Sequence, residues 1–441
     1  MLDSYKKYIQ GDKAVLPYGL TEIEGEAFED CAFLSSVEIP NSVTKIGWRA
    51  FYRCTKLSNI EIPDSVTEIR NDAFNGCTSL YSIDIPNSII DIESDAFANC
   101  ISLKHVAIPS SLSEIGNAVF RNCSGLTSVE IPSCIVKIGW NAFCGCSSLT
   151  SIVIPDSVID IGPFAFQDCT ELTTIVIPKN VRNIGEGAFC GCSGLESITI
   201  SPDNPSYIGV GNCLLDKAGE ILFAGCKNSI IPNTVKSIKE KAFKGCYKLA
   251  DIIIPNDVLE LGNEAFHGCA GLTSIVIPDR VITIGHHAFD GCSCLFSVVI
   301  SDNVEWIGNY AFAECTKLSK IKLPSSLREL GSGAFLNCTG LAEIVIPNGL
   351  RKIGWRCFEG CSSLASIEIP NSTTEIECDF DDCTSLCEMR LLEKNPSVME
   401  SRLDHAELLR ENISLYVPVG TGYAYRHNEF FAHFKEIIPK L

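Results

Sequence analysis

Residues 149–171 read LTSIVIPDSVIDIGPFAFQDCTE, and this stretch decides the fold because it recurs along most of the chain. The shared pattern is L-x-x-I-x-I-P-x-S-V-x-x-I-G-x-x-A-F-x-x-C-x-x. Its cysteine falls at positions 31, 54, 77, 100, 123, 146, 169 and 192, then at 246, 269, 292, 315, 338 and 361, and finally at 383. A phenylalanine stands three residues before each of these cysteines. Because one such unit cannot bury its apolar side alone, the fixed period predicts a solenoid of stacked coils.

The parts of one unit predict the path of its chain. The alternation of Ile152 and Ile154 predicts a strand whose inward side chains reach the core. The proline that follows has no N–H for a sheet and ends this strand. Val158 and Ile161 return a second short segment to the core, and Gly162 permits the next bend. The Ala-Phe-x-x-Cys segment predicts one helical turn with its aromatic ring and thiol facing inward.

The expected fold class is therefore a repeat solenoid, a right-handed β/α coil of about fifteen to seventeen coils. A parallel β-sheet is expected on its concave face, with the short strand and the helical turn on the other side.

The unit resembles the BspA-like class of bacterial leucine-rich repeats, which carries the same L-x-x-I-x-I-P…I-G-x-x-A-F-x-x-C pattern. The resemblance covers about residues 14–391, and residues 413–438 look like that family's terminal cap. It implies a leucine-rich repeat solenoid. It also implies a surface-exposed protein for adhesion or binding, whose partner is a host extracellular-matrix protein, another cell-surface protein or a glycan.

Three parts are expected along the chain: an N-terminal cap at 1–13, the solenoid at 14–391 and a C-terminal cap at 392–441, since terminal repeats must hide an open sheet edge. One coil, between Leu195 and Cys226, is longer than the others, which predicts an insertion at 201–225. Within it, residues 213–223 predict a hairpin that turns at Lys217-Ala218-Gly219. The insertion is interpreted either as a tolerated surface loop or as a partner contact with Lys217 and Glu220 as candidate residues.

Composition excludes several classes of partner. With 35 basic and 54 acidic residues the net charge is −19, so nucleic-acid binding and direct membrane insertion are not expected. The start, MLDSYKKYIQGDKAV, has no apolar core of the kind a secretory signal needs, which leaves an internal protein and a mature or truncated form as alternatives.

The fifteen repeat cysteines predict a buried ladder of thiols that act as small apolar residues. Unpaired thiols favour a reducing or anaerobic environment, whereas the family resemblance implies the cell surface or secretion, and both locations stay open. Cys144-Gly145-Cys146 lacks the four converging ligands of a zinc site, so no metal and no cofactor are expected. His286 and His287 are expected to diverge. Because no nucleophile elbow, phosphate loop or dinucleotide fingerprint is present, we do not expect an enzyme.

The outward position of the first strand carries the main functional candidate. This position is mostly acidic in the first coils and then aliphatic or threonine over seven consecutive coils, which we name the apolar ribbon: Val153, Val176, Thr199, Ile230, Ile253, Val276 and Val299. It is bordered by Ser151, Thr174, Ser197, Asn228, Asp251, Ser274 and Ser297. The ribbon would be about 30 Å long and is interpreted as a contact surface. The alternative is that β-branched residues merely favour strands.

The sequence therefore predicts a non-enzymatic scaffold that binds a protein through the concave sheet and the mid-chain hairpin. The alternative is an intracellular protein that assembles with itself through the apolar ribbon, and an enzyme ranks last. A monomer is expected in preference to an oligomer.

Overall fold

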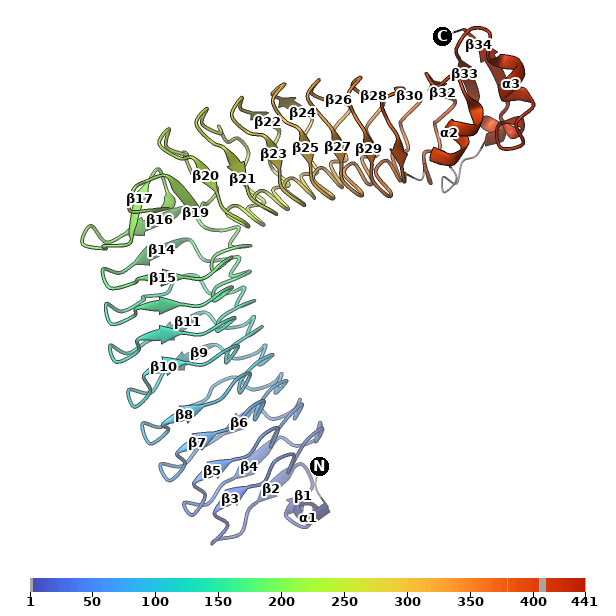
Figure 1. Cartoon of the computed structure of the whole chain (residues 1–441). Helices are drawn as coiled ribbons and strands as arrows, with labels where there is room; N and C mark the ends of the chain where they lie inside the picture. The colour runs from blue at the N-terminus through green and yellow to red at the C-terminus, as the bar shows by residue number, and fades with distance from the viewer. Residues whose placement is uncertain (1–2, 379, 404–409, 441) are drawn as a thin grey trace. The chain divides into compact units, whose positions relative to one another are not determined.

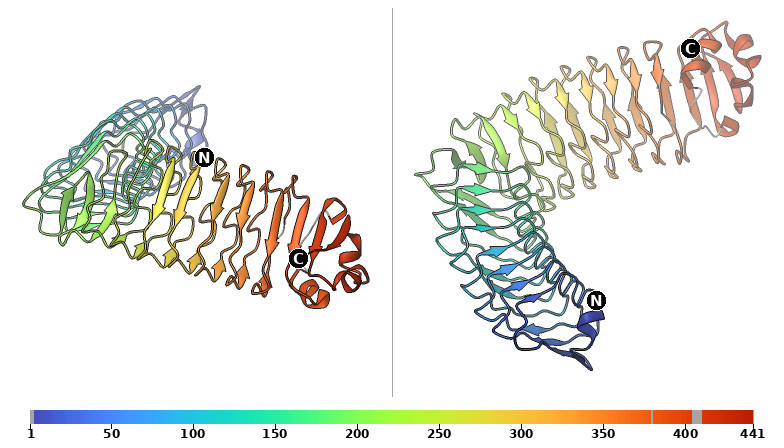
Figure 2. Two further views of the ribbon diagram at one scale, coloured as in Figure 1. Left: turned by 90° about the horizontal axis from the view of Figure 1, so that it is seen from above. Right: turned by 60° about the horizontal axis from the view of Figure 1, so that its bottom comes forward.

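The structure is a computed structural model that describes residues 3–378, 380–403 and 410–440. It is a parallel β-solenoid of about 18 turns with little helix (Figure 1), which confirms the predicted solenoid. The chain divides into two compact units. The first unit comprises residues 1–217 and 224–228, and the second comprises 218–223 and 229–441. Figure 2 shows the coils of each unit stacked with their strands side by side.

In several pairs of adjacent coils the first strand pairs in parallel with its counterpart, so that Ile175 lies opposite Ile198. Side chains alternate as predicted, since Ile175 is 1% exposed and Val176 is 56% exposed. Residues 151–154 and 251–254 keep this alternation without belonging to a regular strand. In the first unit these strands are β2 (Lys13–Val15), β4 (Ser36–Glu38), β6 (Asn59–Ile60), β9 (His105–Ala107), β11 (Ser128–Glu130), β14 (Thr174–Ile177) and β16 (Ser197–Ile200). In the second unit they are β22 (Ser274–Ile277), β24 (Ser297–Ile300), β26 (Lys320–Lys322), β28 (Glu343–Val345), β30 (Ser366–Ile369) and β32 (Glu388–Leu391).

A second, very short strand in each coil builds another parallel ladder. In the first unit these strands are β3 (Glu22–Ile23), β5 (Lys45–Ile46), β7 (Glu68–Ile69), β8 (Asp91–Ile92), β10 (Glu114–Ile115), β12 (Lys137–Ile138), β13 (Asp160–Ile161) and β15 (Asn183–Ile184). In the second unit they are β20 (Ser237–Ile238), β21 (Glu260–Leu261), β23 (Thr283–Ile284), β25 (Trp306–Ile307), β27 (Glu329–Leu330), β29 (Lys352–Ile353) and β31 (Glu375–Ile376).

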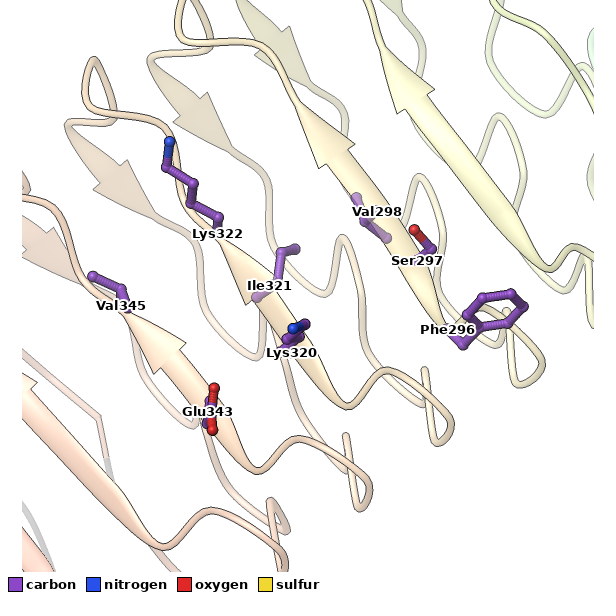
Figure 3. A pocket seen from close by; sticks show the side chains of 8 residues that line it. All are labelled: Phe296, Ser297, Val298, Lys320, Ile321, Lys322, Glu343 and Val345. Atoms are coloured by element: carbon purple, nitrogen blue, oxygen red, sulfur yellow. The ribbon is translucent and has the colours of Figure 1, made fainter.

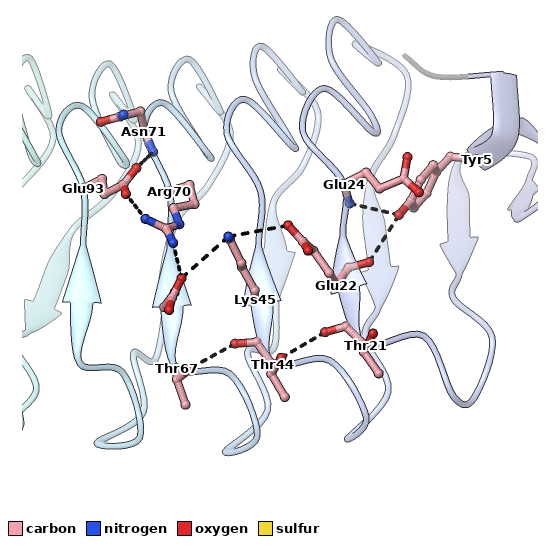
Figure 4. Close-up of polar contacts among 11 residues, drawn as sticks. Tyr5, Thr21, Glu22, Glu24, Thr44, Lys45, Thr67, Arg70, Asn71 and Glu93 are labelled. Atoms are coloured by element: carbon pink, nitrogen blue, oxygen red, sulfur yellow. Dashed lines mark hydrogen bonds and ion pairs between the residues drawn. The ribbon is translucent and has the colours of Figure 1, made fainter.

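Polar side chains also follow the register of the repeat on this second ladder. The ammonium of Lys45 lies 3.8 Å from the carboxylates of both Glu22 and Glu68. The hydroxyl of Thr44 donates to the carbonyl oxygen of Thr21 at 3.1 Å (Figure 4). Ion pairs at the surface contribute little to stability, so the buried isoleucines and the backbone bonds hold the register.

The Ala-Phe-x-x-Cys segment is a run of turns, which corrects the expected helical turn. Glu26 and Asp30 have φ angles of 60° and 57°, so the chain leaves the right-handed helical region at two points of this segment. Every second N–H group of the segment consequently reaches the next coil, as when Phe28 donates to the carbonyl oxygen of Ala50 at 2.7 Å, while Cys31 donates to Phe28 within its own coil. A helical turn would satisfy these groups within one coil, whereas the observed turns add a third ladder of bonds between coils.

The core of each unit contains a stack of phenylalanines and a column of cysteines. The rings of Phe28 and Phe51 are 5.3 Å apart and nearly parallel, and the stack continues to Phe189 in the first unit and from Phe243 to Phe380 in the second. All fifteen repeat cysteines are buried, in agreement with the predicted ladder.

The insertion contains a hairpin that the sequence did not predict. Strands β17 (Tyr207–Val210) and β18 (Cys213–Asp216) are antiparallel, and Val210 lies opposite Cys213. Gly211 and Asn212 between them have φ angles of 59° and 57°, as a tight hairpin turn of this kind requires. The predicted segment 213–223 forms β18 and β19 (Ile221–Ala224).

Asn204 anchors the insertion to the first unit. Its side chain is fully buried, and its amide nitrogen donates to the carbonyl oxygens of Pro178 and Val181 at 2.8 and 3.0 Å. Its amide oxygen accepts the N–H groups of Ser206 and Tyr207. Because each buried polar atom has a partner, the loop is held in one conformation.

Further elements lie toward the two ends: α1 (Asp3–Lys6), β1 (Ile9–Gln10), α2 (Pro396–Leu403), η1 (Arg410–Asn412), β33 (Ser414–Val417), α3 (Gly422–Arg426), η2 (Phe431–His433) and β34 (Glu436–Pro439). The buried ring of Tyr5 lies 5.3 Å from Phe28, at the start of the phenylalanine stack. Strands β32, β33 and β34 pair in parallel, so the ladder continues for two strands beyond β32. The interpretation of the two ends as caps stays a prediction.

Candidate partner-binding face

The part of the apolar ribbon in the first unit comprises Val153, Val176 and Thr199. All three side chains are exposed, and Val153 is 79% exposed between the buried Ile152 and Ile154. Val176 and Thr199 are direct neighbours on β14 and β16. Successive side chains of an extended segment point to opposite faces, so these residues face outward because the isoleucines on either side of them face the core.

The part of the ribbon in the second unit comprises Ile230, Ile253, Val276 and Val299. These side chains are between 55% and 84% exposed. Val276 lies opposite Val299 on β22 and β24. Several adjacent aliphatic side chains therefore face solvent on this unit, where isolated exposed residues would need no explanation.

The bordering polar residues lie on the same strand face as the ribbon. Thr174 is paired with Ser197, and Ser274 with Ser297. Ser151, Thr174, Asn228, Asp251 and Ser274 are exposed, while Ser197 and Ser297 are half-buried. The border thus supplies hydroxyl, amide and carboxylate groups next to the aliphatic side chains of each unit.

Lys217 and Glu220 have local partners. The ammonium of Lys217 donates to the carbonyl oxygen of Asn204 at 2.8 Å, and the carboxylate of Glu220 pairs with Lys236 at 2.5 Å. These contacts give both residues a role in holding their own loops, so they support partner binding less than the ribbon does.

A hollow of about 360 Å³ lies on the first-strand face of the second unit, across β24, β26 and β28 (Figure 3). It is lined by Phe296, Ser297, Val298, Lys320, Ile321, Lys322, Glu343 and Val345. Phe296 is 56% exposed and Val345 is 69% exposed. Sequence reasoning included only Ser297 of these residues, because it ended the apolar ribbon at Val299.

Charged side chains interrupt the aliphatic series within this hollow. Lys320 lies opposite Glu343, and Lys322 lies opposite Val345. The hollow therefore combines an exposed aromatic ring, an aliphatic side chain and charges of both signs. Val345 occupies the same outward repeat position as Val299, and this was the signal that could have identified it. No helix in the described ranges has the length and apolar character needed to cross a membrane.

Stacked strands with one exposed side-chain row define this protein as a leucine-rich repeat scaffold. The family profile described as a BspA type leucine rich repeat region of 6 copies matches this chain in five overlapping or adjacent ranges: residues 4–127, 114–213, 216–330, 260–387 and 305–413. The chain therefore belongs to the BspA-type leucine-rich repeat family.

Solved structures of bacterial proteins show the same fold. A leucine-rich repeat protein from Bacteroides ovatus is 29% identical, with a TM-score of 0.53, over 83% of this chain and 91% of that chain. A leucine rich cell surface protein from Faecalibacterium prausnitzii is 27% identical, with a TM-score of 0.54, over 89% of this chain and 90% of that chain. A leucine-rich repeat protein from Eubacterium ventriosum is 27% identical, with a TM-score of 0.55, over 64% and 83% of the two chains. Among curated proteins, none matches this chain.

Proposed function

We propose that this chain is a non-enzymatic scaffold that binds a partner protein through the apolar ribbon. The observation that carries the proposal is the outward exposure of adjacent aliphatic side chains, such as Val276 and Val299. Equivalent positions in the first coils hold acidic residues, for example Glu38 and Glu130. The scaffold thus accepts charge at this position, and aliphatic residues there are not required for folding.

Adhesion at the cell surface is the finer form of this proposal. It is supported by the likeness to the Faecalibacterium prausnitzii protein, which is described as a leucine rich cell surface protein. A host extracellular-matrix protein, another cell-surface protein or a glycan is the proposed partner. The two parts of the ribbon belong to different units, so each is tested by its own variant.

The test uses the full chain on an array of purified extracellular-matrix proteins and glycans. The variants Val176→Glu and Val276→Glu place a charge in the ribbon of the first and the second unit. Ile159→Glu and Ile282→Glu are matched controls, because both isoleucines are exposed but lie just before the second strand of their coils. We expect at least one ribbon variant to bind about tenfold or more weakly, and both controls to bind like the wild type. Equal binding by all variants, or no binding by the wild type, contradicts the proposal.

Self-assembly is the second candidate function, because the same exposed ribbon could cover itself in a second copy of the chain. Sedimentation across the micromolar range separates the two functions. A mass that rises with concentration in the wild type, and stays constant in Val276→Glu, indicates self-assembly. A monomer at every concentration supports capture of another partner.

A further inference from the structure

Two histidines and one aspartate meet on the turn segments of the second unit. The Nδ1 atom of His287 lies 2.9 Å from Oδ2 of Asp290, and Nδ1 of His267 lies 3.3 Å from the same oxygen. One ligand atom from each residue lies within 4.8 Å of the other two. No other group of three or more potential ligands of this kind comes as close within the described ranges of the chain.

The repeat brings these three residues together from two adjacent coils. His267 and Asp290 occupy the same repeat position, directly after Phe266 and Phe289. His287 stands two positions before Phe289, where its φ of 53° turns the chain. Its ring stacks on Tyr310 at 4.8 Å, which fixes the plane of the imidazole. The neighbouring His286 faces away, since its Nδ1 accepts the N–H of Asn309 at 2.9 Å.

The polar groups around the cluster leave one ligand atom unsatisfied. Nδ1 of His267 is buried, and its 3.3 Å contact with Oδ2 of Asp290 is not a hydrogen bond of proper geometry in the described part of the chain. On the same coil as His267, the carboxylate of Glu264 is occupied by ion pairs with Lys241 and Lys244 of the preceding coil. The side chain of Asp290 is only 16% exposed, so its carboxylate is a fixed anion between the two imidazoles.

The distances suit the coordination shell of a zinc ion. Zinc binds imidazole nitrogen and carboxylate oxygen at about 2.0–2.2 Å, so ligand atoms around a tetrahedral ion lie about 3.3–3.6 Å apart. The distance of 3.3 Å from Asp290 Oδ2 to His267 falls in this range, and the distance of 2.9 Å to His287 is shorter, so the ring of His287 would move outward to admit the ion. Coordination requires small shifts of two side chains that are each partly exposed.

We propose that His267, His287 and Asp290 bind one Zn²⁺ ion through the two Nδ1 atoms and Oδ2. Both imidazoles then carry their proton on Nε2. Three protein ligands leave the fourth position for a water molecule or for a group of a second molecule. This site is separate from the apolar ribbon, and it differs from the absence of metal that the sequence predicted. Sequence reasoning missed it because the three ligands are spread over two coils.

The test uses the full chain, treated first with a chelator and then with iodoacetamide under native conditions to block accessible thiols. Zn²⁺ binding is measured by titration calorimetry, and Co²⁺ serves as a spectroscopic probe of the ligands. The variants are His287→Asn and His267→Asn, and the control is the adjacent His286→Asn. Asparagine suits position 287 because it tolerates a positive φ. His267→Asn removes no hydrogen bond of Nδ1, so it keeps the test valid if the first variant folds poorly.

We expect the wild type and His286→Asn to bind one Zn²⁺ per chain. Loss of a partner outside the coordination shell already weakens metal binding about 10–100-fold, so loss of a direct ligand should weaken it about 100-fold or more. The Co²⁺ form should show the visible absorption of a tetrahedral ion without a thiolate charge-transfer band. Three results would overturn the proposal: the iodoacetamide-treated wild type binds no Zn²⁺, both ligand variants bind Zn²⁺ as tightly as the wild type, or thiolate bands dominate the Co²⁺ spectrum.

Discussion

The thiol of Cys123 donates a hydrogen bond to the backbone carbonyl oxygen of Phe97, 3.1 Å away on the preceding coil. Each repeat cysteine of the series 54–192 and of the series 269–383 makes the same contact with a phenylalanine carbonyl oxygen of the preceding coil. The cysteine position therefore requires a small side chain that also donates a hydrogen bond, which adds a polar role to the apolar one that its spacing predicted.

Replacing Cys123 by alanine should lower the free energy of unfolding by about 2 kcal/mol, because the change removes both the hydrogen bond and buried volume. Urea denaturation followed by tryptophan fluorescence measures this change. The control is Cys387→Ala at an exposed position, where a change within about 0.5 kcal/mol is expected. Equal effects at the two positions would falsify the structural role of the buried thiol.

Alkaline pH should destabilise the chain through these thiols. Burial raises the pKa of Cys123 from its ordinary value of 9.0 to about 12, and it does the same for Cys338. Their contribution to stability is complete below pH 9, where the thiols of the unfolded chain are also protonated. It is lost as the pH rises from 9 to about 12, since only the unfolded chain then releases the proton.

Each such thiol contributes a slope of about 1.4 kcal/mol per pH unit in this range. The free energy of unfolding, measured between about pH 8 and pH 11, should therefore fall less steeply for Cys123→Ala than for the wild type. If the free energy of unfolding falls equally steeply with pH in the two proteins, the raised pKa of the Cys123 thiol is contradicted.

Asn204→Ala should destabilise the insertion by about 3 kcal/mol or more, because two buried carbonyl oxygens and two N–H groups lose their partner. Asn180→Ala is the matched control. The amide of Asn180 donates to the carbonyl oxygen of Asp156 at an exposed site, so its loss should cost about 1 kcal/mol or less. Hydrogen exchange of residues 201–217 measures both effects. Unchanged protection in Asn204→Ala would contradict the anchoring role.

Adjacent residues of β14 should lose very different amounts of stability on the same substitution. Ile175→Glu buries a charge at a position that is 1% exposed, and should cost more than about 4 kcal/mol. Val176→Glu changes an exposed side chain and should alter stability by about 0.5 kcal/mol or less. Thermal unfolding followed by circular dichroism compares the two. Strong destabilisation by Val176→Glu would mean that the outward position is part of the core.

The fixed repeat period was sufficient to predict the inward and outward side chains and the register, although residues 151–154, for which a strand was predicted, form no regular strand. Glu114 lies opposite Lys137 and Ile138 opposite Ile161, because each coil repeats the same choice of inward and outward residues. The exposure of Val153 and Ile253 followed from the same alternation. The register and the exposure depend on residues that are near one another in the unit, so both can be predicted from the sequence of a single unit.

The remaining features depend on contacts between coils. Positions 26, 49, 72 and 118 hold Glu, Arg, Asp and Ala, and all four have a positive φ. Nothing in their residue types predicts this conformation, which the bonds to the next coil enforce. The meeting of His267 with His287 and Asp290 depends on these turns and was therefore not predicted. The hairpin that turns at Gly211-Asn212 was missed for a different reason, since no strand was predicted at 207–210 and residues 213–216 were assigned to the hairpin predicted over 213–223.

The shared register of the coils makes complete coils exchangeable. Unequal recombination that adds or removes a whole unit returns phenylalanine, cysteine and isoleucine to the same columns, so the length of the stack can change while the core is preserved. The outward side chains can be altered coil by coil without disturbing these columns. The length of the stack and the chemistry of its outward face can therefore evolve independently in this chain.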